Sequence, residues 1–259
     1  MNLILPKTFD LRFDFLAEKA KDEGFTVLRY EHTVPAEQGL VFLPMGLGET
    51  ACLDALTLLP EESTVFAGNA ASSVKHLAQT KRIRLIPLLE NEYYLLQNSI
   101  HTAEGVLAEL LARTKRRLDQ LCILIYGYGN CGSAIAKLLW LCGCEIWVWS
   151  RSRGQQRASR DGFNLYPAPQ KGLGMFDGVI NTVPDPVFPL DFLSTMQGGS
   201  FFFQVASGTS GIDPKALEAL DVQSVLLHGL PGKYCPASEA DAIWSVVETT
   251  LDTPRRSTL

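Results

Sequence analysis

The sequence predicts an α/β protein with two domains, each built on a parallel sheet. Short apolar segments alternate with segments of helical periodicity along the chain, a pattern typical of parallel strands covered by helices on both faces. The chain has 259 residues, whereas a single domain usually takes roughly 100–150. We therefore expect a first domain over residues 1–97, to which a C-terminal helix at 236–252 returns. A second domain is expected over residues 98–235, with a cleft between the two.

The elements of the first domain follow from its apolar runs. We expect strands at residues 2–5, 25–30, 39–43, 64–67 and 83–87, and helices at residues 10–23, 53–59 and 72–80. A long helical stretch follows over residues 90–117. Gly105 weakens its pattern, and a break is expected near residues 98–101. We expect the domains to hinge near residues 98–104 and again after Gly232.

The second domain repeats the alternation. Strands are expected at residues 121–126, 145–150, 178–182, 200–206 and 223–228, with helices at 131–142, 190–196 and 214–220. The last helix is expected at residues 238–251, where it can pack back onto the first domain.

Composition narrows the class of protein. Hydrophobic residues make up 46% and charged residues 20%, as in globular proteins, and the net charge of −5 argues against nucleic acid or an anionic membrane as the main partner. No segment reaches the ~20 apolar residues of a membrane span, and the N-terminal segment does not resemble a signal peptide, so we expect a cytoplasmic protein. The six cysteines lack metal-site spacing, and no metal is expected.

A glycine-rich turn follows the first strand of the second domain. Its sequence is Gly127-Tyr128-Gly129-Asn130-Cys131-Gly132, between an apolar strand and an apolar helix. In such a Rossmann turn the first glycine permits the tight turn, the second lets the backbone approach a pyrophosphate, and the third allows close packing of helix on strand. The pyrophosphate would bind the free N–H groups of the helix that starts near Asn130 and Cys131.

The end of the next strand distinguishes the two nicotinamide cofactors. An acidic residue there would bind the ribose hydroxyls of NAD. This chain has Ser150, Arg151, Ser152 and Arg153 instead, and guanidinium groups suit a ribose 2′-phosphate. The segment therefore favours NADP, with NAD still possible and with Arg157 as a further contributor. The alternative is a solvated polar loop that binds nothing.

Further cofactor contacts are expected where other strands of this sheet end, because open α/β sheets bind ligands at the carboxyl ends of their strands. These positions commonly contact the nicotinamide half of the cofactor. They are Thr182, Val183, Pro184, Ala206 and Ser207.

Several segments together resemble the A subunit of bacterial dipicolinate synthase, a family similar to the 2-hydroxyacid dehydrogenases and adenosylhomocysteinase. The specific segments are residues 98–105 and 229–233; the glycine turn, Ser150-Arg151-Ser152 and Asn181-Thr182-Val183-Pro184 also match. Their order and spacing agree over residues 40–247. The resemblance implies two Rossmann-like domains, with the cofactor domain C-terminal.

The resemblance also implies an activity. It is the oxidation of a dihydrodipicolinate-type precursor to pyridine-2,6-dicarboxylate with a nicotinamide cofactor, which the segment at Ser150–Arg153 indicates to be NADP; the product accumulates in endospores during sporulation. The implied partners are a small dicarboxylate substrate and a second, flavoprotein-like subunit; we also expect a homo-oligomer. Two alternatives stay open: a nucleotide-binding regulatory or assembly subunit without chemistry, and a dehydrogenase of another small carboxylate.

The chain departs from the family at three places. The glycines that follow the first strand in the family are missing, although Asp10 and Arg12 match its Asp-x-Arg. The family's Asp-x-Ala-Ser-x-Pro-Gly-Gly becomes residues 204–211, which begin with Gln204. Its Ala-Pro-Lys-Thr-Ala-Gly becomes residues 235–240, which lose a lysine and a glycine.

Candidate catalytic residues are few, because hydride transfer needs a group that takes or gives a proton. They are His101, Glu104 and His228. The alternatives are a polar loop anchor for His228 and a solvated helix face for Glu104. Asp10, Arg12, Asn98 and Thr102 are the candidates for substrate binding. Asp10 could equally cap a helix, with Arg12 exposed.

Overall fold

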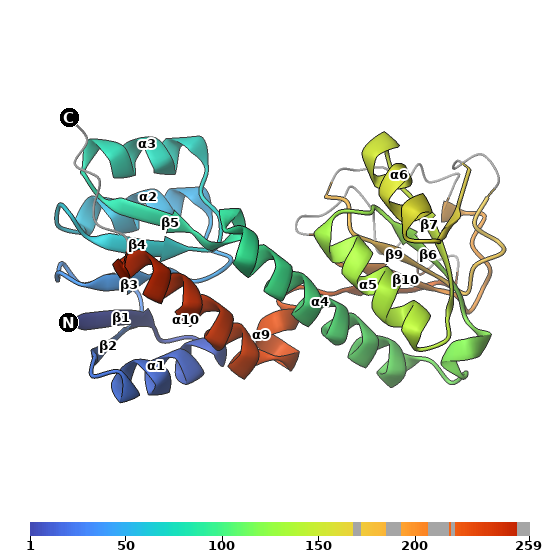
Figure 1. Cartoon of the computed structure of the whole chain (residues 1–259), viewed down its shortest axis with the longest axis horizontal. Helices are drawn as coiled ribbons and strands as arrows, with labels where there is room; N and C mark the ends of the chain where they lie inside the picture. The colour runs from blue at the N-terminus through green and yellow to red at the C-terminus, as the bar shows by residue number, and fades with distance from the viewer. Residues whose placement is uncertain (168–171, 185–192, 207–217, 219–220, 253–259) are drawn as a thin grey trace. The chain divides into compact units, whose positions relative to one another are not determined.

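Both predicted parallel sheets are present in the computed structural model of the chain, which describes residues 1–167, 172–184, 193–206, 218 and 221–252 (Figure 1). The chain divides into a first unit of Met1–Asn98 with the described residues from Pro231 onward, and a second unit of Ser99–Leu230. In both sheets every strand pairs in parallel. The predicted fold class of two parallel α/β sheets is confirmed; the cleft between them stays a prediction.

The first unit has a five-stranded sheet with the order β2-β1-β3-β4-β5. Its strands are β1 (Asn2–Pro6), β2 (Thr26–Tyr30), β3 (Leu40–Phe42), β4 (Thr64–Ala67) and β5 (Arg84–Pro87). Its helices are α1 (Arg12–Asp22), α2 (Glu49–Leu58), α3 (Ser72–Thr80), α9 (Leu230–Tyr234) and α10 (Pro236–Asp252), with a 3₁₀ turn at Leu88–Glu90. The strand at 64–67 and the helix at 72–80 match their predicted bounds.

Helices cover both faces of this sheet because successive strand residues point to opposite faces. Leu3 and Leu5 of β1 pack with side chains of α1 and α10. Ile4, between them, packs with side chains of α2 and α3. The return of the C-terminal helix to the first unit therefore completes one of its two cores.

The second unit has a six-stranded sheet with the order β11-β10-β9-β6-β7-β8. Its strands are β6 (Cys122–Tyr126), β7 (Glu145–Trp149), β8 (Asn164–Leu165), β9 (Gly178–Asn181), β10 (Phe201–Gln204) and β11 (Gln223–Leu226). Its helices include α5 (Asn130–Leu141) and α6 (Ser152–Arg160), with a 3₁₀ turn at Leu118–Gln120. The strand order reverses between β6 and β9, which is where open α/β sheets bind ligands.

The helix α4 (Glu92–Arg113) crosses from one unit to the other without interruption. The break predicted near residues 98–101 is therefore wrong. Ser99, Ala103, Val106 and Leu110 are all buried, and their spacing of four, three and four residues keeps one face of the helix packed through this region.

Besides the two 3₁₀ turns, three short elements were not predicted: α6, β8 and α9. In α6 only Ala158 is buried, so the segment lacks the apolar stripe by which helices are recognised. Of the helix predicted at residues 190–196, residues 190–192 lie outside the described part of the chain, and of the helix predicted at 214–220 only residue 218 is described. No helix in the described part of the chain is long and apolar enough to cross a membrane.

Candidate dinucleotide-binding site

Each glycine of the turn after β6 has a different structural reason to be glycine. Gly127 has φ +99°, which L-residues rarely adopt, and a β-carbon there would lie 2.7 Å from Val183 Cγ2. A β-carbon on Gly132 would overlap the carbonyl oxygen of Gly127. Gly129 is exposed, and a β-carbon built on it would have no neighbouring atom within 4 Å. The turn thus closes tightly at both ends and leaves its middle backbone open to a ligand.

A hollow of about 260 Å³ lies beside this turn, between the carboxyl ends of β6, β7 and β9. Its lining is mainly apolar, and one wall is the ring of Trp149, which stacks on Tyr126 at 4.1 Å between centroids. It unites nine residues from three separate segments: Gly127, Tyr128, Gly129, Trp149, Ser150, Arg151, Thr182, Val183 and Pro184. Seven of these nine are predicted cofactor residues; the sequence prediction missed Tyr128 and Trp149.

A buried amide pair fixes the strand ends on the other side of the hollow. Asn181 Nδ2 donates to Gln204 Oε1 at 2.8 Å, and Gln204 Nε2 donates to the carbonyl of Ala206 at 3.2 Å. Asn181 Oδ1 in turn accepts from the backbone N–H of Val183 at 3.0 Å. Both amides are buried, so Gln204, one of the departures from the family sequence, has a structural role here.

The segment after β7 is rich in hydrogen-bond donors. Helix α6 begins at Ser152, with Arg151 at its N-cap, no side-chain cap and no acidic residue in its first turn. Among the described residues, Ser150 and Arg153 have no side-chain hydrogen bond or ion pair. Arg157 lies instead over the ring of Tyr128, 5.9 Å from its centroid. The first turn of α6 therefore carries the positive end of the helix dipole, and none of its own residues adds a negative charge there.

Side chains of α4 contact the first turn of α5. Ser99 Oγ lies 3.7 Å from Cys131 Sγ, and Thr102 also hydrogen-bonds that sulfur. Burial raises the pKa of the Cys131 thiol despite these hydrogen bonds, so the thiol stays protonated at neutral pH. Asn130, beside it, is exposed. Residues 98–105, one of the two specific family segments, thus contact the glycine turn's helix through Ser99 and Thr102.

The other specific family segment meets the Asp-x-Arg residues in the first unit. Arg12 donates to both oxygens of Asp10, at 2.9 Å from Nε and 2.6 Å from Nη2. A β-carbon on Gly232 of α9 would lie only 2.8 Å from Arg12 Nε and from Asp10 Oδ1. Glycine at this position therefore lets α9 pack directly on the ion pair. Asp10 Oδ1 also accepts a hydrogen bond from the backbone N–H of Arg12 at 3.2 Å, as a residue that caps the start of a helix does, so this part of the alternative agrees with the structure. Arg12 is buried, so the expectation of an exposed arginine is wrong.

This ion pair extends to a second carboxylate. Glu239 of α10 is wholly buried, lies 3.5 Å from Arg12 and accepts a hydrogen bond from the Tyr94 hydroxyl. Burial alone would lower the pKa of Arg12, but its hydrogen bonds and ion pairs with Asp10 outweigh that effect and raise it. Burial raises the pKa of Tyr94, because it disfavours the charged phenolate, and the nearby Glu239 carboxylate raises this pKa further. The departure at Glu239 therefore lies in the packed interior of the first unit.

The remaining predicted residues are divided between the units. His101 is buried and Glu104 exposed on α4, and His228 is exposed just beyond β11; all three belong to the second unit. Asn98 is the last residue of the first segment of the first unit. Ala206 is buried at the end of β10, whereas Ser207 lies outside the described residues. No group of three or more described His, Cys, Asp or Glu side chains could hold a metal ion.

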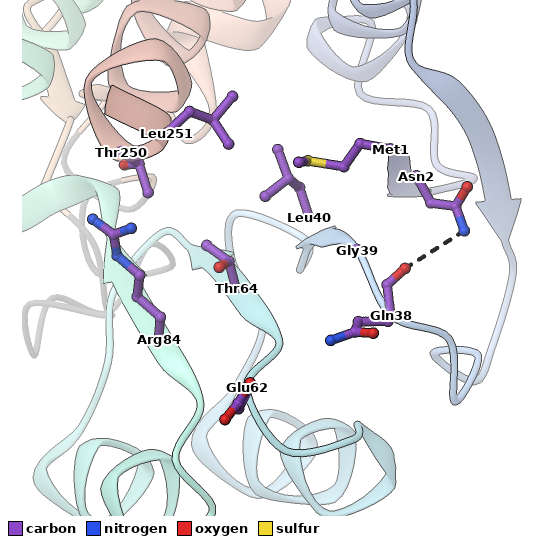
Figure 2. Close-up of a pocket in the computed structure, with 10 residues that line it drawn as sticks. All are labelled: Met1, Asn2, Gln38, Gly39, Leu40, Glu62, Thr64, Arg84, Thr250 and Leu251. Atoms are coloured by element: carbon purple, nitrogen blue, oxygen red, sulfur yellow. Dashed lines mark hydrogen bonds between the residues drawn. The ribbon is translucent and has the colours of Figure 1, made fainter. Parts of the chain in front are cut away.

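A larger hollow, of about 580 Å³, lies in the first unit (Figure 2). Asn2, Leu40, Thr64 and Arg84, at the amino ends of four strands, line it together with Thr250 near the end of α10. Figure 2 shows the Arg84 side chain extending toward Thr250. Ligands of parallel α/β sheets bind at the carboxyl ends of the strands. Despite its size, this hollow is therefore not our candidate for the dinucleotide.

Comparison with known proteins identifies relatives. The A subunit of dipicolinate synthase from Bacillus subtilis (strain 168) is 24% identical over 201 residues, which cover 76% of this chain and 68% of that protein. The chain is similar to the dipicolinate synthase A subunit. The resemblance predicted from the sequence is thus confirmed, although no family model matches the chain.

Solved structures share the fold. The dipicolinate synthase A subunit from Bacillus halodurans superposes with a TM-score of 0.79 at 20% identity, covering 98% of each chain. The NAD-dependent formate dehydrogenase of Staphylococcus aureus, in complex with NAD, has a TM-score of 0.64 at 12% identity, and the match covers 97% of this chain and 96% of that one. The two-domain dehydrogenase fold therefore extends over almost the whole chain.

Proposed function

We propose that the second unit binds NADP and that the protein is an NADP-dependent oxidoreductase similar to the dipicolinate synthase A subunit. The observation that carries the proposal is the hollow at the reversal point of the sheet, with an open glycine turn on one side and an uncapped, acid-free helix start on another. Solved structures of the same fold include dehydrogenases, three of them with NAD bound.

Three parts of the cofactor, the pyrophosphate, the adenine and the 2′-phosphate, have candidate partners in the site. The exposed backbone at Gly129 and the first turn of α5 suit the pyrophosphate, which binds free N–H groups at helix starts. Trp149 and Val183 offer the apolar walls that an adenine needs. Ser150, Arg151, Ser152 and Arg153 would hold the 2′-phosphate. Asn130, Cys131, Thr182, Pro184, Ala206 and Ser207 complete the proposed cofactor-binding set.

The proposed reaction is the oxidation of a dihydrodipicolinate-type ring to pyridine-2,6-dicarboxylate. When bound, NADP⁺ supplies the hydride acceptor. The substrate loses one hydride and one proton, so NADPH and H⁺ are released with the aromatic product. We propose that His101 or His228 takes the proton. We further propose that Glu104 orients the histidine that acts as this proton acceptor.

Of the four residues predicted to bind substrate, we keep Asn98 and Thr102 in the proposal, although Thr102 also hydrogen-bonds the Cys131 sulfur. Arg12 directs its donors to Asp10 and Glu239 inside the first unit, which leaves its guanidinium committed to protein carboxylates. A second, flavoprotein-like subunit remains part of the proposal on the strength of the family resemblance, and a homo-oligomer remains part of it as a separate expectation.

A turnover experiment tests the activity. The purified protein is given NADP⁺ and an enzymatically generated dihydrodipicolinate-type precursor, with and without the flavoprotein subunit, and NADPH and pyridine-2,6-dicarboxylate are measured together. Equal amounts of both products support the proposal. The G129A variant is the control for precursor that oxidises without cofactor, because its binding turn is blocked while the rest of the protein is unchanged.

A second candidate is a protein that binds the dinucleotide as a regulatory or assembly subunit but performs no chemistry. It is favoured by the use of Gln204 and Glu239, two departures from the family sequence, in buried structural contacts. Tight NADPH binding without turnover under any of the above conditions would support this candidate and overturn the first.

A further inference from the structure

The start of helix α6 is packed unusually closely against the residue that precedes it. Gly154, the third residue of the helix, has no positive φ, so its backbone would accept any residue. A β-carbon there would nevertheless overlap Ser150 Oγ and lie 2.7 Å from Ser150 Cβ. β-Carbons essentially never lie within 3.0 Å of a heavy atom outside their own residue and its chain neighbours. Gly154 is therefore glycine because a larger residue has no space there. Without that space, either Ser150 or the helix would have to move.

The rest of α6 is fixed to the glycine turn by a polar cluster. The Tyr128 hydroxyl donates to Asp161, just beyond the end of α6, at 2.7 Å. Lys137 of α5 pairs with the same carboxylate at 3.0 Å, and Arg157 lies over the Tyr128 ring. These contacts join α6 to both the turn and α5. The helix therefore cannot accommodate a larger residue at position 154 simply by sliding outward.

This packing sets the distance between two anion sites. The proposed pyrophosphate site is the turn at Gly129, and the proposed 2′-phosphate site is the Ser150 hydroxyl with the first turn of α6. In the cofactor both phosphates are attached to one ribose, so their separation is nearly constant. A displacement of α6 by a fraction of an ångström would lengthen the hydrogen bonds to the 2′-phosphate but none to the pyrophosphate.

We infer that Gly154 is a positioning residue that determines the preference for NADP over NAD by seating the first turn of α6 against Ser150. The inference rests on the proposed function, because it requires the 2′-phosphate to bind at this turn. The inference adds Gly154 to the residues that determine cofactor preference, although Gly154 is not among the proposed cofactor contacts and belongs to no sequence motif.

The test is a double-mutant cycle on the pair, read out as dissociation constants for NADPH and NADH. G154A is expected to weaken NADPH binding about tenfold, the size of a lost charged hydrogen bond, and to change NADH binding less than about twofold. S150G removes the obstructing side chain and one donor, so we expect a loss of about threefold for NADPH. In S150G/G154A the nearest remaining contact is Tyr128 Cβ at 3.4 Å, an ordinary distance, so this variant should bind NADPH as S150G does.

The outcomes separate the inference from the proposed function. If the wild type binds NADPH no better than NADH, the proposed NADP site is wrong and the inference falls with it. If the wild type prefers NADPH but the effects of G154A and S150G simply multiply in the double variant, only the inference is overturned. Should G154A fail to fold, S150G and S150G/G154A still decide: equal NADPH affinities support the inference and a further loss overturns it. The exposed Gln156 supplies the matched control, Q156A, on the same helix.

Discussion

The guanidinium of Arg12 donates to both carboxylate oxygens of Asp10, and the backbone of Gly232 packs directly on this ion pair. Breaking a buried ion pair leaves an uncompensated charge in the interior. We therefore expect D10A to lower the free energy of unfolding by about 3 kcal/mol, measured by chemical denaturation. The control is E31A, which removes an exposed ion pair with Lys7 and should cost less than about 1 kcal/mol. Equal losses for the two variants would contradict a structural role for the buried pair.

Two glycines of the same turn should respond differently to one added methyl group. G132A forces a β-carbon against the carbonyl of Gly127, so we expect a loss of about 1–3 kcal/mol in stability together with loss of dinucleotide binding. G129A meets no protein atom and should keep the wild-type melting temperature, yet it places a methyl group where the backbone is open to the pyrophosphate. Thermal denaturation and NADPH titration of both variants check this. A G129A protein that binds NADPH normally would contradict the placement of the pyrophosphate.

Arg151 lines the hollow and stands at the N-cap of α6. We expect R151A to weaken NADPH binding by about 1–3 kcal/mol and to leave NADH binding nearly unchanged, because only the former carries the 2′-phosphate. R160A, which removes an arginine from the last turn of the same helix, is the matched control for net charge. A similar loss for both cofactors in R151A would mean that the guanidinium acts elsewhere than on the 2′-phosphate.

Local chemistry explains why the glycine turn could be predicted from the sequence. The strand, the three glycines and the helix are adjacent in the chain, and the contact that requires glycine at position 132 is with Gly127 of the same turn. The alternation of elements likewise revealed both sheets. By contrast, α6 is polar on nearly every side, so its existence depends on its packing against Tyr128 and Ser150 rather than on an apolar stripe.

Contacts between distant segments could not be predicted in the same way. Arg12 and Glu239 are 227 residues apart, and Tyr94 and Glu239 are 145 apart. A glutamate near the start of a helix is normally exposed, and only the return of α10 to the first sheet buries this one. The hydrogen bond between Asn181 and Gln204 is likewise a contact between distant segments. It depends on the register in which β10 pairs with β9, and the sequence does not specify that register residue by residue.

The cluster that anchors α6 predicts a pH dependence. The hydrogen bond from Tyr128 and the ion pair with Lys137 lower the pKa of Asp161 below its ordinary value of 3.8. A carboxyl group whose pKa is lower in the folded than in the unfolded protein stabilises the fold above the unfolded pKa, and this contribution is lost as the pH falls through the folded pKa. The wild type should therefore be more stable than D161N at pH 6, by a few tenths of a kcal/mol for an exposed group, and the difference should vanish as the pH falls below 3.8. Denaturation of both proteins across this range measures the difference. D119N, which removes an exposed ion pair with Arg117 in the second unit, shows how much of any change follows the loss of any exposed, paired carboxylate. A constant difference between wild type and D161N at every pH would contradict the assignment.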